Sequence, residues 1–297
     1  RETKQKPFIL KFALNDLRCP EIEKPNSMGF FSVTGNLVFP LPSSALLYAS
    51  TAINLLAGPG VWRSEATGAS LQYSKFWNSG GQRKDSRPTY VASRTGMLIA
   101  YIPALAVAAS SFVLFPRGGG STRMLLVQSS LSLHFFKRIF EVMFVHKFSG
   151  LAALSSSLFI SCSYLTTTST ILYAQCFTMG LPEPAVDLKL AGFVLFLVGI
   201  VGNLYHHVVL AKLRSDGNKE YKIPKGGMFR VVICPHYFFE MVDLVGISFM
   251  SQTVCGFSAV FLMICYLMGR SYNTRKWYLS KFEDFPSHVK AVIPFVF

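Results

Sequence analysis

The sequence is poor in charged residues, and acidic residues are the scarcer kind. Only 15% of its 297 residues are charged, against about 25% in an ordinary soluble domain. Lys and Arg number 29 and Asp and Glu only 15, a net charge of +14, while 51% of the residues are hydrophobic. So much apolar surface excludes intrinsic disorder. So little charge argues against an ordinary water-soluble enzyme, because it would cover the surface poorly.

Several common motifs are also missing. The six cysteines form no CxxC pair, which argues against a disulfide scaffold or a zinc module. No GxGxxG, P-loop or Ser-His-Asp signature is readable, so any nicotinamide cofactor would bind outside a Rossmann fold. The adjacent His206 and His207 point their rings about 100° apart on a helix, and we predict no metal site. Residues 1–27 lack the apolar core of a secretory signal.

What the chain does contain is apolar segments of membrane-spanning length. A helix needs about 20 apolar residues to cross the hydrocarbon of a bilayer, and backbone hydrogen bonding in lipid favours helices. The pattern therefore predicts an all-α polytopic membrane protein with about seven transmembrane helices. The segments are 37–57, with Pro40 and Pro42 in its opening turn, 96–115, 124–145, 151–179, 188–211, 237–253 and 255–269.

Basic residues gather in alternate connections between these segments. Residues 63–94, 212–230 and 270–290 are rich in Lys and Arg, whereas the intervening connections hold few. By the positive-inside rule the C-terminus is cytoplasmic, and this spread over separate loops argues against nucleic-acid binding. The basic stretch 1–27 fits only as a poorly ordered extension before a natural start at Met28. We expect N-terminal helices and a basic loop over 28–125 and a C-terminal domain over 126–297.

Ionisable side chains inside membrane segments mark candidate functional sites. His134, Lys137, Arg138 and Glu141 share one helix face at i, i+3, i+4 and i+7. They form either a neutralising structural cluster or the lining of an internal cavity.

A second polar stripe lies at the end of the fifth segment. Asn203, His207 and Arg214 fall on one helix face, and together they suit a polar, anionic ligand, because Arg binds phosphate in bidentate fashion. The alternative is interfacial residues that extend to lipid headgroups.

A third group follows in the sequence. Gly226 and Gly227 predict a tight turn, His236 and Glu240 are spaced i, i+4 at the start of the sixth segment, and Arg270, Thr274 and Tyr278 follow at four-residue intervals. All these residues lie near the expected cytoplasmic face, where a phosphate-bearing cofactor could reach them.

The C-terminal third contains four longer motifs: Tyr221–Phe229, Cys234–Tyr237 with Glu240, Trp277–Pro286 and Lys290–Phe297. Through these motifs it resembles the steroid 5α-reductase family. Residues 70–77 resemble a plant branch of that family. The resemblance implies a seven-helix protein of the endoplasmic reticulum membrane that uses NADPH to reduce a carbon–carbon double bond conjugated to a carbonyl. We therefore expect an oxidoreductase of lipid or steroid metabolism, with 3-oxo-4-ene steroids as the favoured substrates.

The resemblance also implies site residues. The matching cofactor-binding positions are Asn203, His207, Arg214, Tyr221, His236, Glu240, Arg270 and Tyr278. His207, His236 and Thr274 differ from the steroid enzymes' usual Asp, Asn and His. At the substrate end, the family's Glu and Tyr are replaced by Tyr101 and Phe135. We therefore expect Tyr101 to donate a hydrogen bond to the substrate carbonyl, with His134 or Lys137 assisting.

Other readings remain open. His134–Glu141 with Phe144–Ser149 also resembles the very-long-chain 2-enoyl-CoA reductases, polyprenol reductase is a third relative, and a non-catalytic membrane binding protein would keep the same fold. In the reductase readings an apolar substrate enters laterally from the bilayer. The sequence predicts no oligomeric state.

Overall fold

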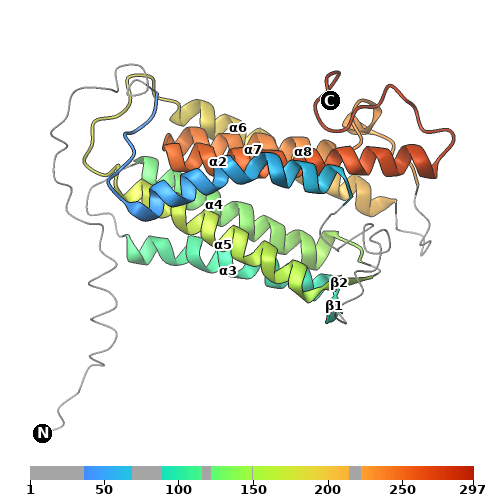
Figure 1. The fold of residues 1–297 in the computed structure, drawn as a ribbon, viewed down its shortest axis with the longest axis horizontal. Coiled ribbons are helices and arrows are strands. Elements are labelled where there is room, and N and C mark those ends of the chain that lie inside the picture. Colours follow the sequence, from blue (N-terminus) through green and yellow to red (C-terminus); the bar gives the residue numbers. More distant parts are fainter. Residues whose placement is uncertain (1–36, 69–88, 116–121, 149, 214–221) are drawn as a thin grey trace, which may run out of the picture.

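Seven α-helices account for most of the described chain, which is taken here from a computed structural model (Figure 1). The structure describes residues 37–68, 89–115, 122–148, 150–213 and 222–297. The helices are α2 (Ala45–Ala66), α3 (Ser93–Leu114), α4 (Thr122–Phe140), α5 (Leu154–Cys176), α6 (Lys189–Lys212), α7 (Pro235–Ser251) and α8 (Val254–Lys281). Each of the seven predicted apolar segments therefore corresponds to a helix. The expected extension 1–27 lies outside the described residues.

The ends of two helices differ from the prediction. Pro40 and Pro42 precede α2, which begins at Ala45 because the Ser44 side chain accepts a hydrogen bond from the Leu47 N–H. The same helix continues past Pro59 to Ala66, although Gly-Pro-Gly usually ends a helix. Its second half lies against α8 so closely that a Cβ on Gly269 would stand 2.5 Å from the Trp62 carbonyl oxygen. This contact holds α2 helical, and α8 in turn extends to Lys281.

Short elements complete the fold. Strands β1 (Tyr90–Ala92) and β2 (Leu151–Ala153) pair antiparallel, with Tyr90 opposite Ala153. A π-helical turn, η3 (Glu141–Val145), follows α4, and a 3₁₀ turn, η4 (Gly227–Arg230), precedes α7. Gly226 and Gly227 both have positive φ, which confirms the predicted turn.

The helices pack in pairs along the bundle. Helix α6 runs against α7, α2 against α8, and α3 against α5 (Figure 1). The α6–α7 contact uses glycines that let the backbones approach closely. A Cβ on Gly199 would collide with the Asp243 backbone nitrogen, and one on Gly192 would lie 2.7 Å from the Gly246 carbonyl oxygen. Small residues at such contacts are typical of helices packed within membranes.

The outer surface is apolar and the interior holds polar groups. Large apolar side chains are exposed on several helices, including Leu56 on α2, Val113 on α3 and Leu190 on α6. By length and composition, α3, α6 and α8 qualify as candidate membrane spans among the described residues. Meanwhile Arg123, Glu141 and Asp243 are buried. This distribution is the inverse of the ordinary soluble pattern and fits a bundle surrounded by lipid.

Arg123 stabilises one end of the bundle through ion pairs and a hydrogen bond. Its guanidinium lies 2.5 Å from Glu183 and 3.0 Å from Asp187, and it donates to the Met250 carbonyl oxygen at 2.7 Å. Burial alone raises the pKa of Glu183, but hydrogen bonds from Arg123 and Lys189 outweigh this effect and bring the pKa below its ordinary value. The start of α4 is therefore joined to the α5–α6 connection by ion pairs and to the last turn of α7 by a hydrogen bond.

Candidate active site

A buried ionic cluster lies at the opposite end of the bundle, centred on Glu141. This carboxylate is fully buried where α4 passes into η3. Its oxygens lie 3.0 Å from Lys137, 3.3 Å from Arg138 and 3.0 Å from His207 Nδ1. The predicted face of α4 therefore points inward. Its charged side chains are paired with one another, because a buried ion needs a partner of opposite charge.

Arg138 connects this cluster to α3 and α7. It donates to the Tyr101 hydroxyl at 2.5 Å, and its guanidinium stands 4.9 Å from the centre of the Tyr101 ring. It also lies 3.9 Å from Glu240. The predicted residue Tyr101 thus belongs to the site, and its hydroxyl oxygen accepts a hydrogen bond from Arg138.

Lys137 connects the cluster to α6. Its ammonium donates to the Asn203 side-chain oxygen, and the Asn203 amide donates to the His236 carbonyl oxygen at 2.7 Å. The rings of His207 and His236 are 5.3 Å apart. The structure therefore brings Lys137, Asn203, His207 and His236 together, although the sequence assigned them to separate clusters.

Asp243 belongs to the site and was not among the predicted residues. It is fully buried on α7, and its carboxylate lies 3.3 Å from His134 Nδ1. The sequence could have indicated it, because Asp243 is an acidic residue within the apolar segment 237–253 and buried ionisable groups in membrane helices mark function.

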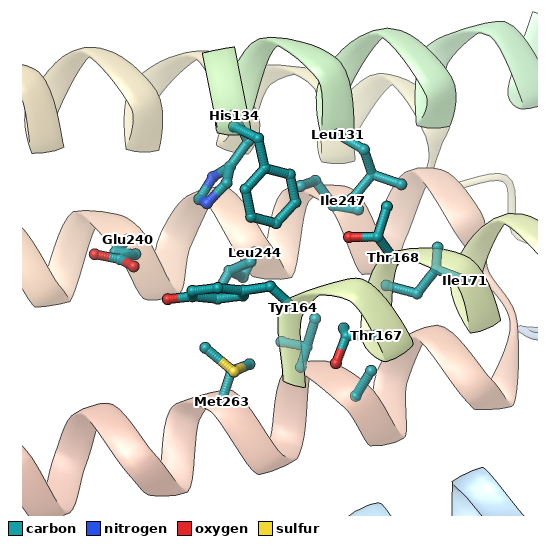
Figure 2. A pocket seen from close by; sticks show the side chains of 13 residues that line it. Leu131, His134, Tyr164, Thr167, Thr168, Ile171, Glu240, Leu244, Ile247 and Met263 are labelled. Atoms are coloured by element: carbon teal, nitrogen blue, oxygen red, sulfur yellow. The ribbon is translucent and has the colours of Figure 1, made fainter. Parts of the chain in front are cut away.

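A cavity adjoins the cluster, enclosed by α4, α5, α7 and α8 (Figure 2). Its volume is about 30 Å³, room for water only, so a larger ligand requires side chains to move. His134, Glu240 and the Tyr164 hydroxyl gather at one end, whereas Leu131, Ile171 and Ile247 line the other together with Thr167 and Thr168. The ionisable groups thus lie at one end, and the rest of the wall is mainly apolar. Tyr164 was missed by the sequence reasoning because a Tyr among the Ser and Thr residues of α5 carries no signal.

Other predicted residues lie apart from the cavity wall. Arg270 is buried in an ion pair with Glu65 of α2 at 3.1 Å. Tyr278 is buried against Phe282 and Phe285. Arg214 and Tyr221 lie outside the described residues. His206 points away from His207, as predicted, and accepts a hydrogen bond from the Met228 N–H at 3.2 Å. The turn at Gly227 therefore packs on His206.

Three potential metal ligands meet in the cluster. Ligand atoms of Glu141, His146 and His207 lie within 4.8 Å of one another. However, Lys137 and Arg138 already pair with Glu141, and a divalent cation there would lie beside these two positive groups. The absence of a metal stays a prediction.

Sequence comparison identifies relatives of this chain. A family model described as 3-oxo-5-alpha-steroid 4-dehydrogenase matches residues 148–297. The chain belongs to this family. The match covers α5 to α8, and so includes Tyr164 and the positions where the sequence predicts cofactor binding, whereas Tyr101, His134 and Lys137 precede it. Together with the three candidate spans, membership makes the chain a multi-pass membrane protein.

Individual relatives share parts of the chain. It is 40% identical over 108 residues to 3-oxo-5-alpha-steroid 4-dehydrogenase 1 of Homo sapiens, covering 36% of this chain. It is 42% identical over 109 residues to a steroid 5-alpha-reductase of Gossypium hirsutum, again 36% of this chain. In both cases the match spans 42% of the relative's own length. A very-long-chain enoyl-CoA reductase of Dictyostelium discoideum is 32% identical over 167 residues, 56% of this chain and 55% of the relative.

Proposed function

We propose that this protein is a membrane-bound, NADPH-dependent oxidoreductase that reduces a carbon–carbon double bond conjugated to a carbonyl in a lipid, with a 3-oxo-4-ene steroid as the favoured substrate. Family membership supports the reaction class. The observation that carries the proposal is the cavity, because its apolar length ends at His134, Tyr164 and Glu240. A steroid enone has the matching form, an apolar body with a carbonyl at one end.

The residues at the polar end fit a nicotinamide. The Glu240 carboxylate is buried, and its Oε2 has no hydrogen-bond donor among the described residues. Buried acceptors require partners, and the carboxamide N–H₂ of a nicotinamide would supply one. Because Glu240 also lines the cavity, a ring held there would face the substrate. NADPH, when bound, supplies the hydride.

Further contacts to NADPH are assigned from the family resemblance. We assign Asn203, His207 and His236 to its nicotinamide end, since they surround the same ionic cluster. Arg214, Tyr221, Arg270 and Tyr278 are assigned to its phosphate and adenosine end. For Arg270 to bind a phosphate of NADPH, its guanidinium must contact the phosphate while it stays paired with Glu65 or after it leaves Glu65.

The protein's own residues stabilise charge during the reaction. Hydride addition at the β-carbon leaves negative charge on the carbonyl oxygen, and nearby donors and cations lower that barrier in a water-poor site. His134 lies on the cavity wall. Lys137, Arg138 and Tyr101 form the polar layer behind it. We assign them to electrostatic stabilisation and to excluding water.

Two alternative substrates keep the same chemistry. A long-chain 2-enoyl-CoA is suggested by the very-long-chain enoyl-CoA reductase of Dictyostelium discoideum, which matches 56% of this chain. A polyprenol precursor is the other. A non-catalytic binding protein of the same fold would bind lipid without consuming NADPH.

The cellular setting follows from the same argument. We place the protein in the endoplasmic reticulum membrane with seven transmembrane helices, a cytoplasmic C-terminus and lateral substrate entry. The ends of α2, α6 and α8 that lead into basic stretches all lie at the end of the bundle that carries the ionic cluster (Figure 1). Membership of a plant branch and the division at residue 125 stay predictions.

Two measurements test the proposal: activity with a panel of substrates, and NADPH binding by two Glu→Gln variants. Purified protein in nanodiscs should consume NADPH with progesterone, and less with a long-chain enoyl-CoA or a polyprenal. Glu240→Gln should weaken NADPH binding about tenfold or more, because it loses a charge-assisted acceptor. Glu183→Gln, the same change at the far end of the bundle, should leave binding unchanged. Equal NADPH affinity in the Glu240 variant would remove Glu240 from the cofactor site.

A further inference from the structure

We propose that the phenol of Tyr164 on α5 is the group that hydrogen bonds to the substrate's carbonyl oxygen. This inference rests on the proposed reductase function and names the residue that acts on the substrate. Tyr164 is one of the residues that line the cavity, and its hydroxyl points toward the end occupied by Glu240 and His134 (Figure 2).

Aromatic neighbours fix the Tyr164 ring. Its centroid lies 5.4 Å from the Phe135 ring, nearly edge to face, and 5.6 Å from the Tyr101 ring. Aromatic pairs at such distances are mutually stabilising. The hydroxyl is thus held in one direction before a substrate arrives, which a donor to a developing negative charge requires.

The two residues that replace the family's acidic pair are less suited to this role. Phe135 has no hydroxyl. Tyr101 is not one of the residues that line the cavity. Tyr164 therefore contributes the one phenol on the cavity wall within the described part of the chain. Tyr101 is a positioning residue that holds Arg138 behind it.

The proposed reaction balances in atoms and charge, and Tyr164 keeps its proton throughout. A hydride adds to the β-carbon as reduced nicotinamide is oxidised, and the carbonyl becomes an enolate. The Tyr164 hydroxyl donates a hydrogen bond to the enolate oxygen and keeps its proton. A proton that comes ultimately from water then adds to the α-carbon, which restores the carbonyl. The net reaction consumes one enone, one NADPH and one proton.

Removal of one hydroxyl tests this role. Tyr164→Phe should lower kcat by about 100-fold, the effect expected for loss of one oxyanion donor, with NADPH affinity unchanged. Tyr173→Phe is the matched control on the same helix, where the ring packs on Phe177, and it should keep wild-type kcat. Adding Phe135→Tyr to Tyr164→Phe returns a hydroxyl to the neighbouring ring and should recover part of the lost activity.

A spectroscopic readout separates donation from packing. The infrared carbonyl stretch of a bound, carbonyl-labelled steroid enone should shift to lower frequency in the wild type, and the shift should be lost in Tyr164→Phe. Unchanged kcat and an unchanged stretch in Tyr164→Phe, while the wild type turns over, would overturn the role of Tyr164 alone. A wild type that reduces no enone would overturn the proposed function and this inference together.

Discussion

The ion pair between Glu65 and Arg270 provides a quantitative test of what Arg270 does. Both side chains are buried, and the pair joins α2 to α8 at 3.1 Å. Glu65→Gln breaks this buried ion pair, which typically costs about 3–5 kcal/mol. For a domain of this size each kcal/mol lowers Tm by about 2–4 °C, so Tm should fall by about 6–20 °C.

Thermal unfolding of detergent-solubilised protein, followed by tryptophan fluorescence, measures this effect. The double variant Glu65→Leu with Arg270→Met removes both charges and should unfold close to the wild type, because replacing a whole buried pair by apolar residues is often neutral. Single variants that unfold at the wild-type temperature, or a double variant whose loss equals the sum of the singles, would refute the reasoning.

The same variants separate structure from cofactor binding. NADPH should raise the Tm of the wild type by mass action. If the Arg270 guanidinium also contacts NADPH, Arg270→Gln should lose this rise, whereas Glu65→Gln should keep it.

Three further predictions follow from particular contacts. Gly199→Ala should destabilise the protein by about 1–3 kcal/mol through overpacking, because its Cβ meets the α7 backbone, whereas Gly60→Ala, with nothing within 4 Å, should not; equal Tm values would contradict this. The pKa of Glu183 lies below its ordinary 4.5, so its contribution to stability is present above that pH and lost as pH falls. Wild-type Tm should therefore drop more than that of Glu183→Gln between about pH 5 and pH 3, and parallel curves would oppose it. Tyr101→Phe should lower turnover more than NADPH affinity, because it releases Arg138; unchanged turnover would remove Tyr101 from the site.

Hydropathy predicted the helices well, and packing decided where the predictions failed. Apolar segments of membrane-spanning length located all seven helices. The first predicted segment ended at residue 57, yet α2 continues to Ala66, where it lies against α8. Likewise, the polar last third of α8 remains helical to Lys281, where Arg270 pairs with Glu65. Local sequence cannot show such long-range contacts.

The candidate site was predictable only in part, because it too depends on long-range contacts. Helical spacing gave the inward face of α4, and burial of Lys137 and Glu141 confirmed it. That His207 of α6 meets Glu141, and that Glu240 of α7 lies beside Arg138, depends on tertiary packing, which helical spacing does not contain. Tyr164 stands in a Ser- and Thr-rich helix without a charged neighbour in sequence, and only the cavity reveals its position.

Transfer of deuterium measures the central claim most directly. Wild-type protein in nanodiscs, supplied with a 3-oxo-4-ene steroid and NADPH deuterated at the transferable position, should release a saturated 3-oxo steroid that carries deuterium at the former β-carbon. Mass spectrometry of the product shows it. Unlabelled or unreduced steroid, with the protein folded and NADPH bound, would contradict the account.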